Sequence, residues 1–403
     1  MTATIEKASV LPRGWSLVRL ADVGSFLSGS GFPLVYQGNT SGNLPFFKVS
    51  DFSNPGNERT LNRANHYIAE ETRRKLGARL LPEGAIAFAK IGAAIFLERK
   101  RIIDQSSCLD NNMAAFVLSA PEISRDLILA HFQSFALGGL VSSTALPAIS
   151  STDLKSIEFP LPDDPKEQQA IAEALSDADG LIEGLERLIA KKRLIKQGAM
   201  QDLLTAKRRL PGFSGEWVSK PLFDICRFSS GKAHEPYIDP LGNFICVNSK
   251  FISTDGDVAK FCSKCVSPAR KDDILLVMSD LPNGRALAKA FLVQENDRYA
   301  VNQRICILRP NIEQDPRFLF HILNRNKYFL AFDDGVNQTH LLNSVFERCT
   351  LNMPATLQEQ VEIGTILSDM DAEIQALETR LVKARQVKEG MMQNLLTGRI
   401  RLV

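Results

Sequence analysis

The residue types that most often do chemistry, cysteine and histidine, are few and scattered in this chain. Seven cysteines include one C-x-x-C pair, Cys262 and Cys265, and Cys246 or Cys306 could complete a zinc site only if the fold brought them together. No metal-ligand spacing links the five histidines, which are His66, His131, His234, His321 and His340. We therefore expect ordinary buried or half-buried thiols in a reducing compartment, and no metal site.

Motifs of the common catalytic and nucleotide-binding sites are also missing. The sequence has no G-x-x-x-x-G-K-[ST] loop, no G-x-G-x-x-G after a strand, no H-E-x-x-H or G-x-S-x-G, and no Asn/Asp-Pro-Pro-aromatic motif of adenine methylation. Ser230-Gly231-Lys232 is only a fragment of a phosphate-binding loop. The sequence therefore favours a binding and scaffolding subunit over an enzyme.

Charge and composition restrict how such a protein could bind its partners. The net charge is only +2, so any nucleic-acid contact must come from local basic clusters rather than from the chain as a whole. No apolar run reaches membrane-spanning length and no secretory signal is evident, so we expect a cytoplasmic protein without membrane contact. The basic clusters are Arg73-Arg74-Lys75, Arg99-Lys100-Arg101, Lys191-Lys192-Arg193, Lys207-Arg208-Arg209 and Arg270-Lys271.

A long segment of the sequence occurs twice, and the elements that it forms must position the basic clusters. Residues 162–205 align without a gap onto residues 354–397 at a constant offset of 192, with 20 identities in 44 positions. Neither copy has a proline beyond Pro165 or Pro354, and both carry apolar residues at alternating spacings of four and three, which predicts long helices with a coiled-coil seam, roughly 60 Å each. The residues predicted to pack along the helices are Ile171, Leu175, Ile182, Leu185 and Ile189 in the first copy, and Ile363, Leu367, Ile374, Leu377 and Leu381 in the second.

The two intervening regions, 13–158 and 209–350, are more divergent and rich in short apolar runs. Their openings match, because Trp15, Leu20, Asp22 and Gly29 recur as Trp217, Leu222, Asp224 and Gly231. We predict strands at 45–49, 85–89, 94–97 and 113–118, with counterparts at 244–247, 273–278, 288–293 and 304–308. A helix is predicted after each set, at 126–137 and 317–332, with His131 and His321 in matching places. The regions should share a fold and differ in their loops.

These features resemble a known family. A variable region closed by Phe159-Pro160-Leu161-Pro162, followed by Glu167-Gln168-Gln169-Ala170-Ile171 at the start of a long helix, looks like the specificity subunit of type I restriction-modification enzymes. The second half repeats the pattern with Met353-Pro354, Glu359-Gln360 and the ending Leu395-Leu396-Thr397-Gly398-Arg399-Ile400. The first half departs from the family in having Asp163-Asp164 after the proline.

The resemblance implies a fold and a function. The fold would be α+β, with two similar α/β target recognition domains separated by two long antiparallel helices that form a coiled-coil spacer. The expected segments are recognition domain 1 at 1–158, the first spacer helix at 159–208, recognition domain 2 at 209–350 and the second spacer helix at 351–403. Each domain would read half of a split, asymmetric site in double-stranded DNA. Half-sites about one helical turn apart, roughly 34 to 36 Å, would face the same side of the DNA.

The resemblance also implies partners and places the cofactors on them. Two modification subunits would dock along the helices and methylate adenines flipped from the duplex, and restriction subunits with helicase and nuclease activity would join them. The chain itself would bind no cofactor, because S-adenosylmethionine would belong to the modification subunits, and ATP and magnesium to the restriction subunits.

Candidate base-reading residues are the polar side chains in loops beside predicted strand ends. Arginine and lysine read guanine, and asparagine and glutamine read adenine. In the first domain the candidates are Lys90, Arg99 and Arg101, and Ser142, Ser143 and Thr144. In the second domain they are Ser279, Asn283 and Arg285, and Asn337, Gln338 and His340.

Three other interpretations stay open at this point. A standalone two-domain DNA-binding regulator would explain two readers, although such regulators are usually symmetric dimers of identical chains. A coiled-coil adaptor without a DNA role would explain the helices and leave the variable regions without a purpose. An enzyme with an unrecognised site is the third.

Overall fold

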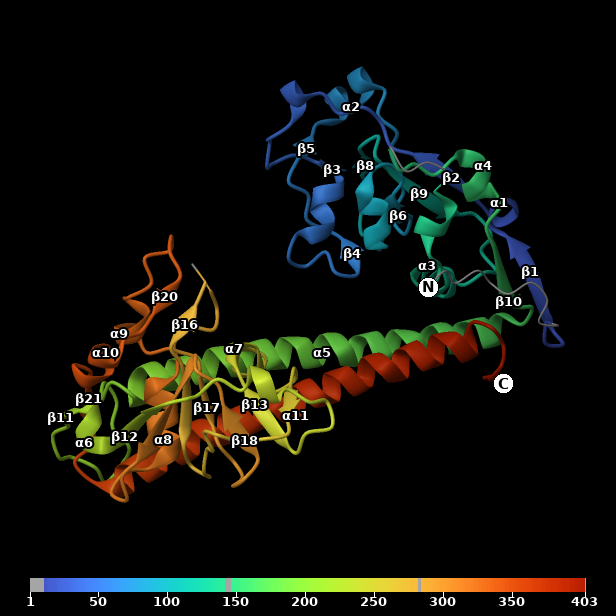
Figure 1. The fold of residues 1–403 in the computed structure, drawn as a ribbon. Coiled ribbons are helices and arrows are strands. Elements are labelled where there is room, and N and C mark those ends of the chain that lie inside the picture. Colours follow the sequence, from blue (N-terminus) through green and yellow to red (C-terminus); the bar gives the residue numbers. More distant parts are fainter. Residues whose placement is uncertain (1–10, 142–145, 282–283, 403) are drawn as a thin grey trace. The chain divides into compact units, whose positions relative to one another are not determined.

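The computed structural model describes residues 11–141, 146–281 and 284–402 (Figure 1). Contacts divide the chain into two units, one made of residues 1–184 with 380–403 and the other of residues 185–379. Each unit therefore holds one α/β domain and part of each long helix.

The first domain is built on two sheets. A five-stranded sheet has the order β2-β9-β6-β7-β4, and a three-stranded sheet has the order β5-β3-β8. The strands are β1 (Trp15–Arg19), β2 (Gly24–Ser28), β3 (Leu44–Phe47), β4 (Thr60–Leu61), β5 (Tyr67–Ile68), β6 (Ile86–Ala89), β7 (Lys100–Ile103), β8 (Cys108–Leu109), β9 (Met113–Leu118) and β10 (Glu158–Pro162). The helices are α1 (Leu20–Val23), α2 (Glu70–Leu76), α3 (Arg125–Ser134) and α4 (Ser151–Lys155).

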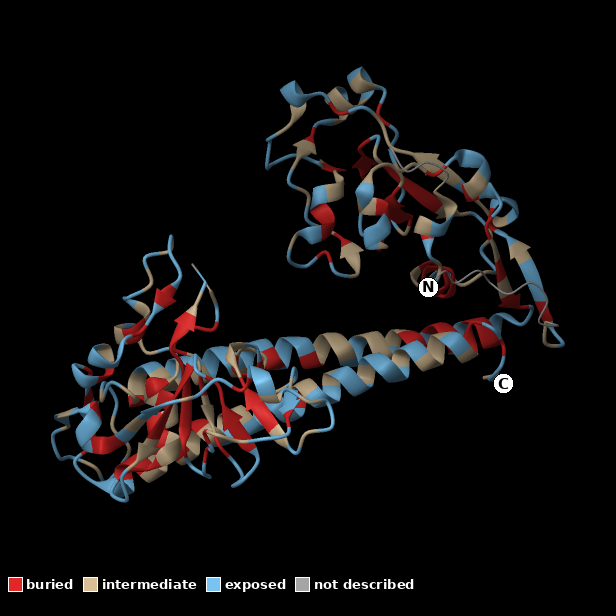
Figure 2. Ribbon diagram, viewed as in Figure 1, coloured by how far each residue is buried: buried red, intermediate tan, exposed pale blue. Residues whose placement is uncertain are grey.

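Side chains alternate between two cores across the larger sheet, because successive residues of a strand point to opposite faces. Phe88 and Phe116 face the core that contains Phe132 of α3, whose ring lies 5.9 Å and 5.7 Å from theirs. Ala87 and Ala115 face the opposite core, with the smaller sheet. The central strands β6 and β9 are largely buried on both faces (Figure 2), so they appear in the sequence as continuous apolar runs.

The second domain repeats this plan. Its larger sheet has the order β12-β19-β15-β17, and its smaller sheet the order β14-β13-β18. The strands are β11 (Val218–Pro221), β12 (Cys226–Ser230), β13 (Phe244–Val247), β14 (Lys260–Cys262), β15 (Ile274–Val277), β16 (Ser279–Asp280), β17 (Ala290–Leu292), β18 (Tyr299–Val301), β19 (Ile305–Pro310), β20 (Thr339–His340) and β21 (Thr350–Met353). The helices are α6 (Leu222–Ile225), α7 (Ser249–Ser253), α8 (Pro316–Leu323), α9 (Lys327–Leu330) and α10 (Asn343–Glu347).

The shared fold predicted from the sequence is confirmed by strand pairing. In the smaller sheets, β3 and β13 each have one antiparallel and one parallel neighbour. The strand that opens each domain pairs with the strand that closes it, as β1 with β10 and β11 with β21. Gly29 and Gly231 are also equivalent, since a Cβ atom at either would lie 1.9 Å or 2.2 Å from the carbonyl oxygen of Asp110 or Asn302. Only glycine fits there.

The two long helices are α5 (Pro165–Leu203) and α11 (Leu357–Leu395), of 39 residues each. In the first unit Asp179 of α5 lies 2.6 Å from Lys388 of α11, and in the second unit Lys196 pairs with Asp371. Within each unit the early part of one helix therefore meets the late part of the other, which is an antiparallel arrangement. Among the described residues, no helix combines the length and the apolar character needed to cross a bilayer.

The repeated sequence makes repeated contacts at the start of each long helix. Glu167 binds Arg401 through two hydrogen bonds, and Glu359 binds Arg209 in the same way. The amide oxygen of Gln168 accepts the backbone N–H of Ser124, the N-cap of α3, and that of Gln360 accepts the N–H of Asp315, the N-cap of α8. Identical residues are therefore needed where each helix joins its domain, which explains why the helices are alike while the domains diverge.

The residues predicted to pack along the helices fall into two groups. Those near the start of each helix lie in domain cores: Ile171 and Leu175 share a buried cluster with Leu395, and Ile363 and Leu367 share one with Leu203. The remainder lie farther along the helices, where Leu185, Ile189, Ile374 and Leu377 are buried and Ile182 and Leu381 are half-buried.

Two sequence predictions of secondary structure are wrong. Residues 94–97 form not a strand but a 3-10 helix, Ala93–Leu97, between positive φ angles at Gly92 and Glu98. Residues 317–332 form two helices, α8 and α9, because Arg325 has a φ of 58° and its guanidinium donates to the Leu287 carbonyl at 2.9 Å. In the second case, a tertiary contact overrides the local pattern.

The matching places predicted for His131 and His321 are also wrong by one residue. His131 lies seven residues after its N-cap and His321 six, so they face different neighbours. His131 stacks on Phe159 at 4.8 Å, and burial lowers its pKa to about 3, partly opposed by a hydrogen bond to the backbone of Pro160. The Nε2 of His321 lies 3.2 Å from the Ser368 hydroxyl, and burial lowers its pKa to about 4. Both are neutral packing residues at pH 7.

Candidate functional site

In the second domain, predicted reading residues come together in a short two-stranded ribbon. The ribbon consists of β16 and β20, in which Ser279 pairs with His340 and Asp280 with Thr339. The Gln338 amide donates to the Ser279 hydroxyl at 3.1 Å. The structure therefore joins two loops that lie about 60 residues apart in the sequence, at the end of β15.

The predicted residues of this ribbon differ in their solvent exposure and in whether their side chains already make hydrogen bonds. Arg285, Gln338 and His340 are exposed, whereas Ser279 is buried. Asn337 is exposed, but its side-chain amide donates to Asp334 at 2.9 Å. Asn283 lies outside the described residues. Arg285, Gln338 and His340 are therefore the stronger candidates for base contacts.

Carboxylates accept backbone hydrogen bonds in both loops of the ribbon. Asp280 accepts the backbone N–H groups of Leu281 at 2.9 Å and Ala286 at 2.7 Å. Asp334 accepts those of Val336 and Asn337, and these hydrogen bonds, with that from the Asn337 amide, lower its pKa to about 2. The loop that contains Asp334 is thus shaped by internal hydrogen bonds that stay in place at neutral pH.

The first domain has the same ribbon with different residues. Ile91 and Ala148 form an antiparallel bridge, and the Lys90 carbonyl accepts the Ile149 N–H at 3.0 Å. In the second domain the Met278 carbonyl accepts the Leu341 N–H at 2.8 Å, so Lys90 occupies the place of Met278. The Lys90 ammonium donates to the Ser28 hydroxyl at 2.9 Å. The predicted residues Ser142, Ser143 and Thr144 lie outside the described residues.

The other two basic candidates of the first domain lie on or beside β7. Arg101 pairs with Ala87 in the middle of β6, and its guanidinium donates to the Asn57 carbonyl at 2.7 Å. Burial lowers the pKa of Arg101. Arg99 donates to the Ser53 hydroxyl at 2.6 Å and is half-buried. The structure thus gives Arg101 a packing role away from the strand end where Lys90 lies.

Two exposed cations at the ribbon end of the second domain were not among the predicted residues. The Arg304 carbonyl accepts the Met278 N–H at 2.9 Å, and the Lys232 N–H donates to the Val301 carbonyl at 3.0 Å. Both side chains are exposed. Lys232 belongs to the Ser230-Gly231-Lys232 fragment, and Arg304 is the first residue of a predicted strand. The sequence could have indicated them as candidates only as cations next to a strand end.

A groove lies between the domain and the long helices in each unit. The first groove has a volume of about 740 Å³ and the second about 1030 Å³. Besides domain side chains such as Phe135 in the first and Phe320 in the second, both are lined by the same five helix residues at an offset of 192. These pairs are Asp179 and Asp371, Ile182 and Ile374, Arg385 and Arg193, Lys388 and Lys196, and Met392 and Met200.

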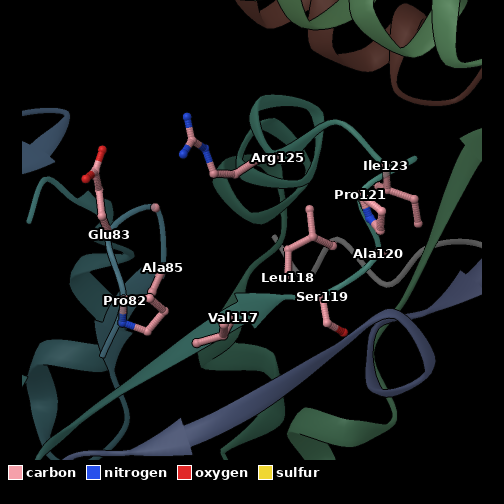
Figure 3. Close-up of a pocket in the computed structure, with 11 residues that line it drawn as sticks. Pro82, Glu83, Ala85, Val117, Leu118, Ser119, Ala120, Pro121, Ile123 and Arg125 are labelled. Carbon is pink, nitrogen blue, oxygen red and sulfur yellow. The ribbon is translucent and has the colours of Figure 1, made fainter. Parts of the chain in front are cut away.

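A smaller hollow of about 350 Å³ lies at the end of the first domain's larger sheet where β6 begins and β9 ends (Figure 3). This end is opposite the end that carries Lys90. Its charged lining residues are Glu83 and Arg125, among apolar and small side chains such as Val117, Leu118 and Ile123. No pair of groups there provides a nucleophile with a base.

The cysteines behave as expected for buried thiols. Cys246, Cys262 and Cys265 belong to one small apolar cluster, while Cys306 lies in the main core of the second domain. Burial raises the pKa of Cys246 to about 11 and raises that of Cys262 as well. Within the described part of the chain, no group of three or more cysteine, histidine or carboxylate side chains is placed to hold a metal ion.

Known proteins are similar to this chain in sequence and in fold. Residues 12–191 and 214–384 match the family described as Type I restriction modification DNA specificity domain. The Type I restriction enzyme MjaVIII specificity subunit of Methanocaldococcus jannaschii is 22% identical over 424 residues, which cover 97% of this chain and 94% of that protein. The MjaIX specificity subunit of the same organism is 24% identical over 180 residues, covering 44% of this chain and 40% of that protein.

Solved structures agree at the level of the fold. The S subunit of a type I restriction-modification system from M. genitalium superposes with a TM-score of 0.65 at 17% identity, over 98% of this chain and 99% of that one. A chain from a study of complex assembly and conformational transition of the type I R-M system gives 0.55 at 15% identity, over 98% of this chain and 100% of that one. With two copies of the domain matched over most of its length, the chain belongs to the family of type I restriction-modification DNA specificity subunits, which are non-catalytic.

Proposed function

We propose that this chain reads a two-part, asymmetric DNA sequence, one half with each domain, and carries modification and restriction subunits to it. The observation that supports this most is the ribbon built twice at the same strand end with different side chains. Lys90 replaces Met278, and Ala148 replaces His340, on a shared backbone pattern. A kept backbone scaffold with changed side chains fits two readers of different half-sites. Such a protein acts in the cytoplasm, where the DNA is.

Replacing Arg285 by Ala is the direct test of the reading surface. We expect the preference at one base pair of the half-site read by the second domain to relax, with a loss of roughly 5- to 150-fold against the preferred base, because one good contact to guanine contributes about 1 to 3 kcal/mol. The other half-site should not change. Binding of the assembled complex to a library of half-site variants measures the base preference in each of the two half-sites.

The matched control is Arg270→Ala. Arg270 is equally an exposed arginine, but it precedes β15 and so lies at the opposite end of the strand from Ser279. It should leave the preference for both half-sites intact. Equal loss in both half-sites with Arg285→Ala, or a matching loss with Arg270→Ala, would assign Arg285 a general role in folding or phosphate binding.

The two helix grooves are the proposed docking sites for two copies of the modification subunit. Identical partners need equivalent surfaces, and the five residue pairs shared by the grooves provide them. Each groove combines an apolar floor, with Ile182 and Met392 in the first, and a charged rim that includes the Asp179–Lys388 pair. S-adenosylmethionine would be held by those subunits, and ATP and magnesium by the restriction subunits.

Charge reversal separates the two docking sites. Arg385→Glu in the first groove and Arg193→Glu in the second should each reduce the number of bound modification subunits from two to one, and the double variant should bind none. Native mass spectrometry of the co-purified complex counts the copies directly. The control is Lys191→Glu with Lys383→Glu, which reverses two exposed charges of the same helices outside the grooves.

The pattern of loss decides the interpretation. One groove variant that releases both subunits would indicate a single shared site, and a control that behaves like the groove variants would indicate a general charge effect on assembly.

A further inference from the structure

An apolar side chain stands at the tip of the second domain's ribbon, among polar neighbours. Val336 is 76% exposed and lies between Asp334 and Gln338 in the loop that leads into β20. An isolated exposed valine needs no explanation by itself. This one differs because the loop that carries it is held in a fixed shape beside the proposed reading residues.

Internal hydrogen bonds fix the position of Val336 before any partner binds. The Gly335 N–H donates to Asp333 at 3.0 Å, and the N–H groups of Val336 and Asn337 donate to Asp334 at 2.9 Å and 2.8 Å. Gly335 has a φ of 70°, which glycine adopts at little cost. Valine itself has a stiff side chain, since its branched Cβ restricts χ1. Little conformational entropy is therefore lost when Val336 makes a contact.

The charges around Val336 restrict where the tip can lie on DNA. The carboxylates of Asp333 and Asp334 adjoin the tip and would repel backbone phosphates, whereas Arg285 and Gln338 are exposed polar side chains in the loops of the same ribbon. A tip with this arrangement fits the base edges better than the phosphate backbone. In the major groove, the apolar group on the base edges is the thymine C5-methyl.

We infer that Val336 reads a thymine through contact with its C5-methyl group, and so adds an apolar determinant to the half-site read by the second domain. The inference rests on the proposed function, since it assumes that the ribbon enters the major groove. It identifies a reader that hydrogen-bonding rules alone would miss.

A cycle that combines Val336→Ala with removal of the methyl group tests the contact. Each thymine of the half-site is replaced in turn by deoxyuridine, and binding of the assembled complex is measured for both proteins. One replacement should weaken binding by the unaltered protein about fourfold, the equivalent of one buried methyl at about 0.8 kcal/mol. Val336→Ala should weaken binding to thymine DNA by a similar factor and should be indifferent to that one replacement.

Ile312→Ala is the matched control. Ile312 is 97% exposed and follows β19, at the end of the sheet away from the ribbon. The Ile312→Ala variant should therefore bind all DNAs as the unaltered protein does. Sequence-specific binding with no thymine coupled to Val336 would overturn the inference and leave the proposed function standing. Absence of sequence-specific binding by the unaltered complex would overturn both. A rise in 2-aminopurine fluorescence that depends on Val336, without methyl coupling, would instead indicate insertion between base pairs.

Discussion

Exchanging residues 13–162 for the matching region of another family member is expected to replace one half of the recognised sequence and keep the other half and the gap between them. The change should be large, because specific sites are typically bound 10³-fold or more tightly than others. The original half-site should fall to that background, and the donor's half-site should take its place. Sequencing of adenine methylation in cells that carry the chimera with its partners gives both half-sites and the gap between them in one experiment.

The structure sets the boundary of this exchange. The variable region ends at residue 158 by sequence, but β1 pairs with β10 from Trp15 opposite Pro162 to Arg19 opposite Glu158. A cut at 158 would join a donor β1 to a host β10, whereas a cut after Pro162 keeps the pair together and leaves Glu167 and Gln168 to bind Arg401 and Ser124.

A chimera cut after Pro162 should therefore fold as well as its parents. If the gap changes while both half-sites persist, the domains would be spacing elements and the assignment of reading to them would fail. If both half-sites change, the two domains would not read independently.

The parts of the fold that could be predicted from sequence are those where burial acts on contiguous residues. Residues 113–118 and 244–247 were predicted as strands with their observed bounds, because β9 and β13 are buried in the domain interior and appear as continuous apolar runs. The helix repeat was visible because Glu167 and Glu359 make the same ion pairs in both units.

The parts that escaped prediction depend on distant residues. The pairing of Ser279 with His340 joins residues about 60 positions apart, and no local pattern records it. Asn337 has the residue type of an adenine reader, yet Asp334 occupies its amide, and Arg101 has that of a guanine reader, yet the Asn57 carbonyl occupies its guanidinium. Residue type therefore identifies what a side chain could bind, and only its neighbours decide what it does bind.

Lengthening both long helices together is expected to widen the gap between the half-sites without changing the bases read. Four residues inserted after Ala190 in α5 add about 6 Å, or about 1.8 base pairs at 3.4 Å each. A matching insertion in α11 belongs after Glu378, so that Arg193 and Glu378, which pair in the second unit, stay on the same side of it. Methylation sequencing again gives the gap and the two half-sites.

An insertion in α5 alone should behave differently. It would shift α5 by about one turn relative to α11 on one side of the insertion. The Asp179–Lys388 pair and the Lys196–Asp371 pair could then not both form. Such a variant should lose stability rather than gain a clean new spacing. The same four residues inserted after Ile312, in an exposed loop, should leave the gap unchanged.

The length of the insertion provides a second check on the spacer. Seven residues in each helix add about 10.5 Å, close to three base pairs, and return the apolar seam to within about 20° of its original phase, whereas four residues rotate it by about 40°. If the helices set the distance, the gap should grow in proportion to the length added, and the seven-residue variant should be the more stable of the two. A gap that stays fixed in a folded, active complex would mean that the domains find their half-sites independently of the helices, and the spacer role would have to be abandoned.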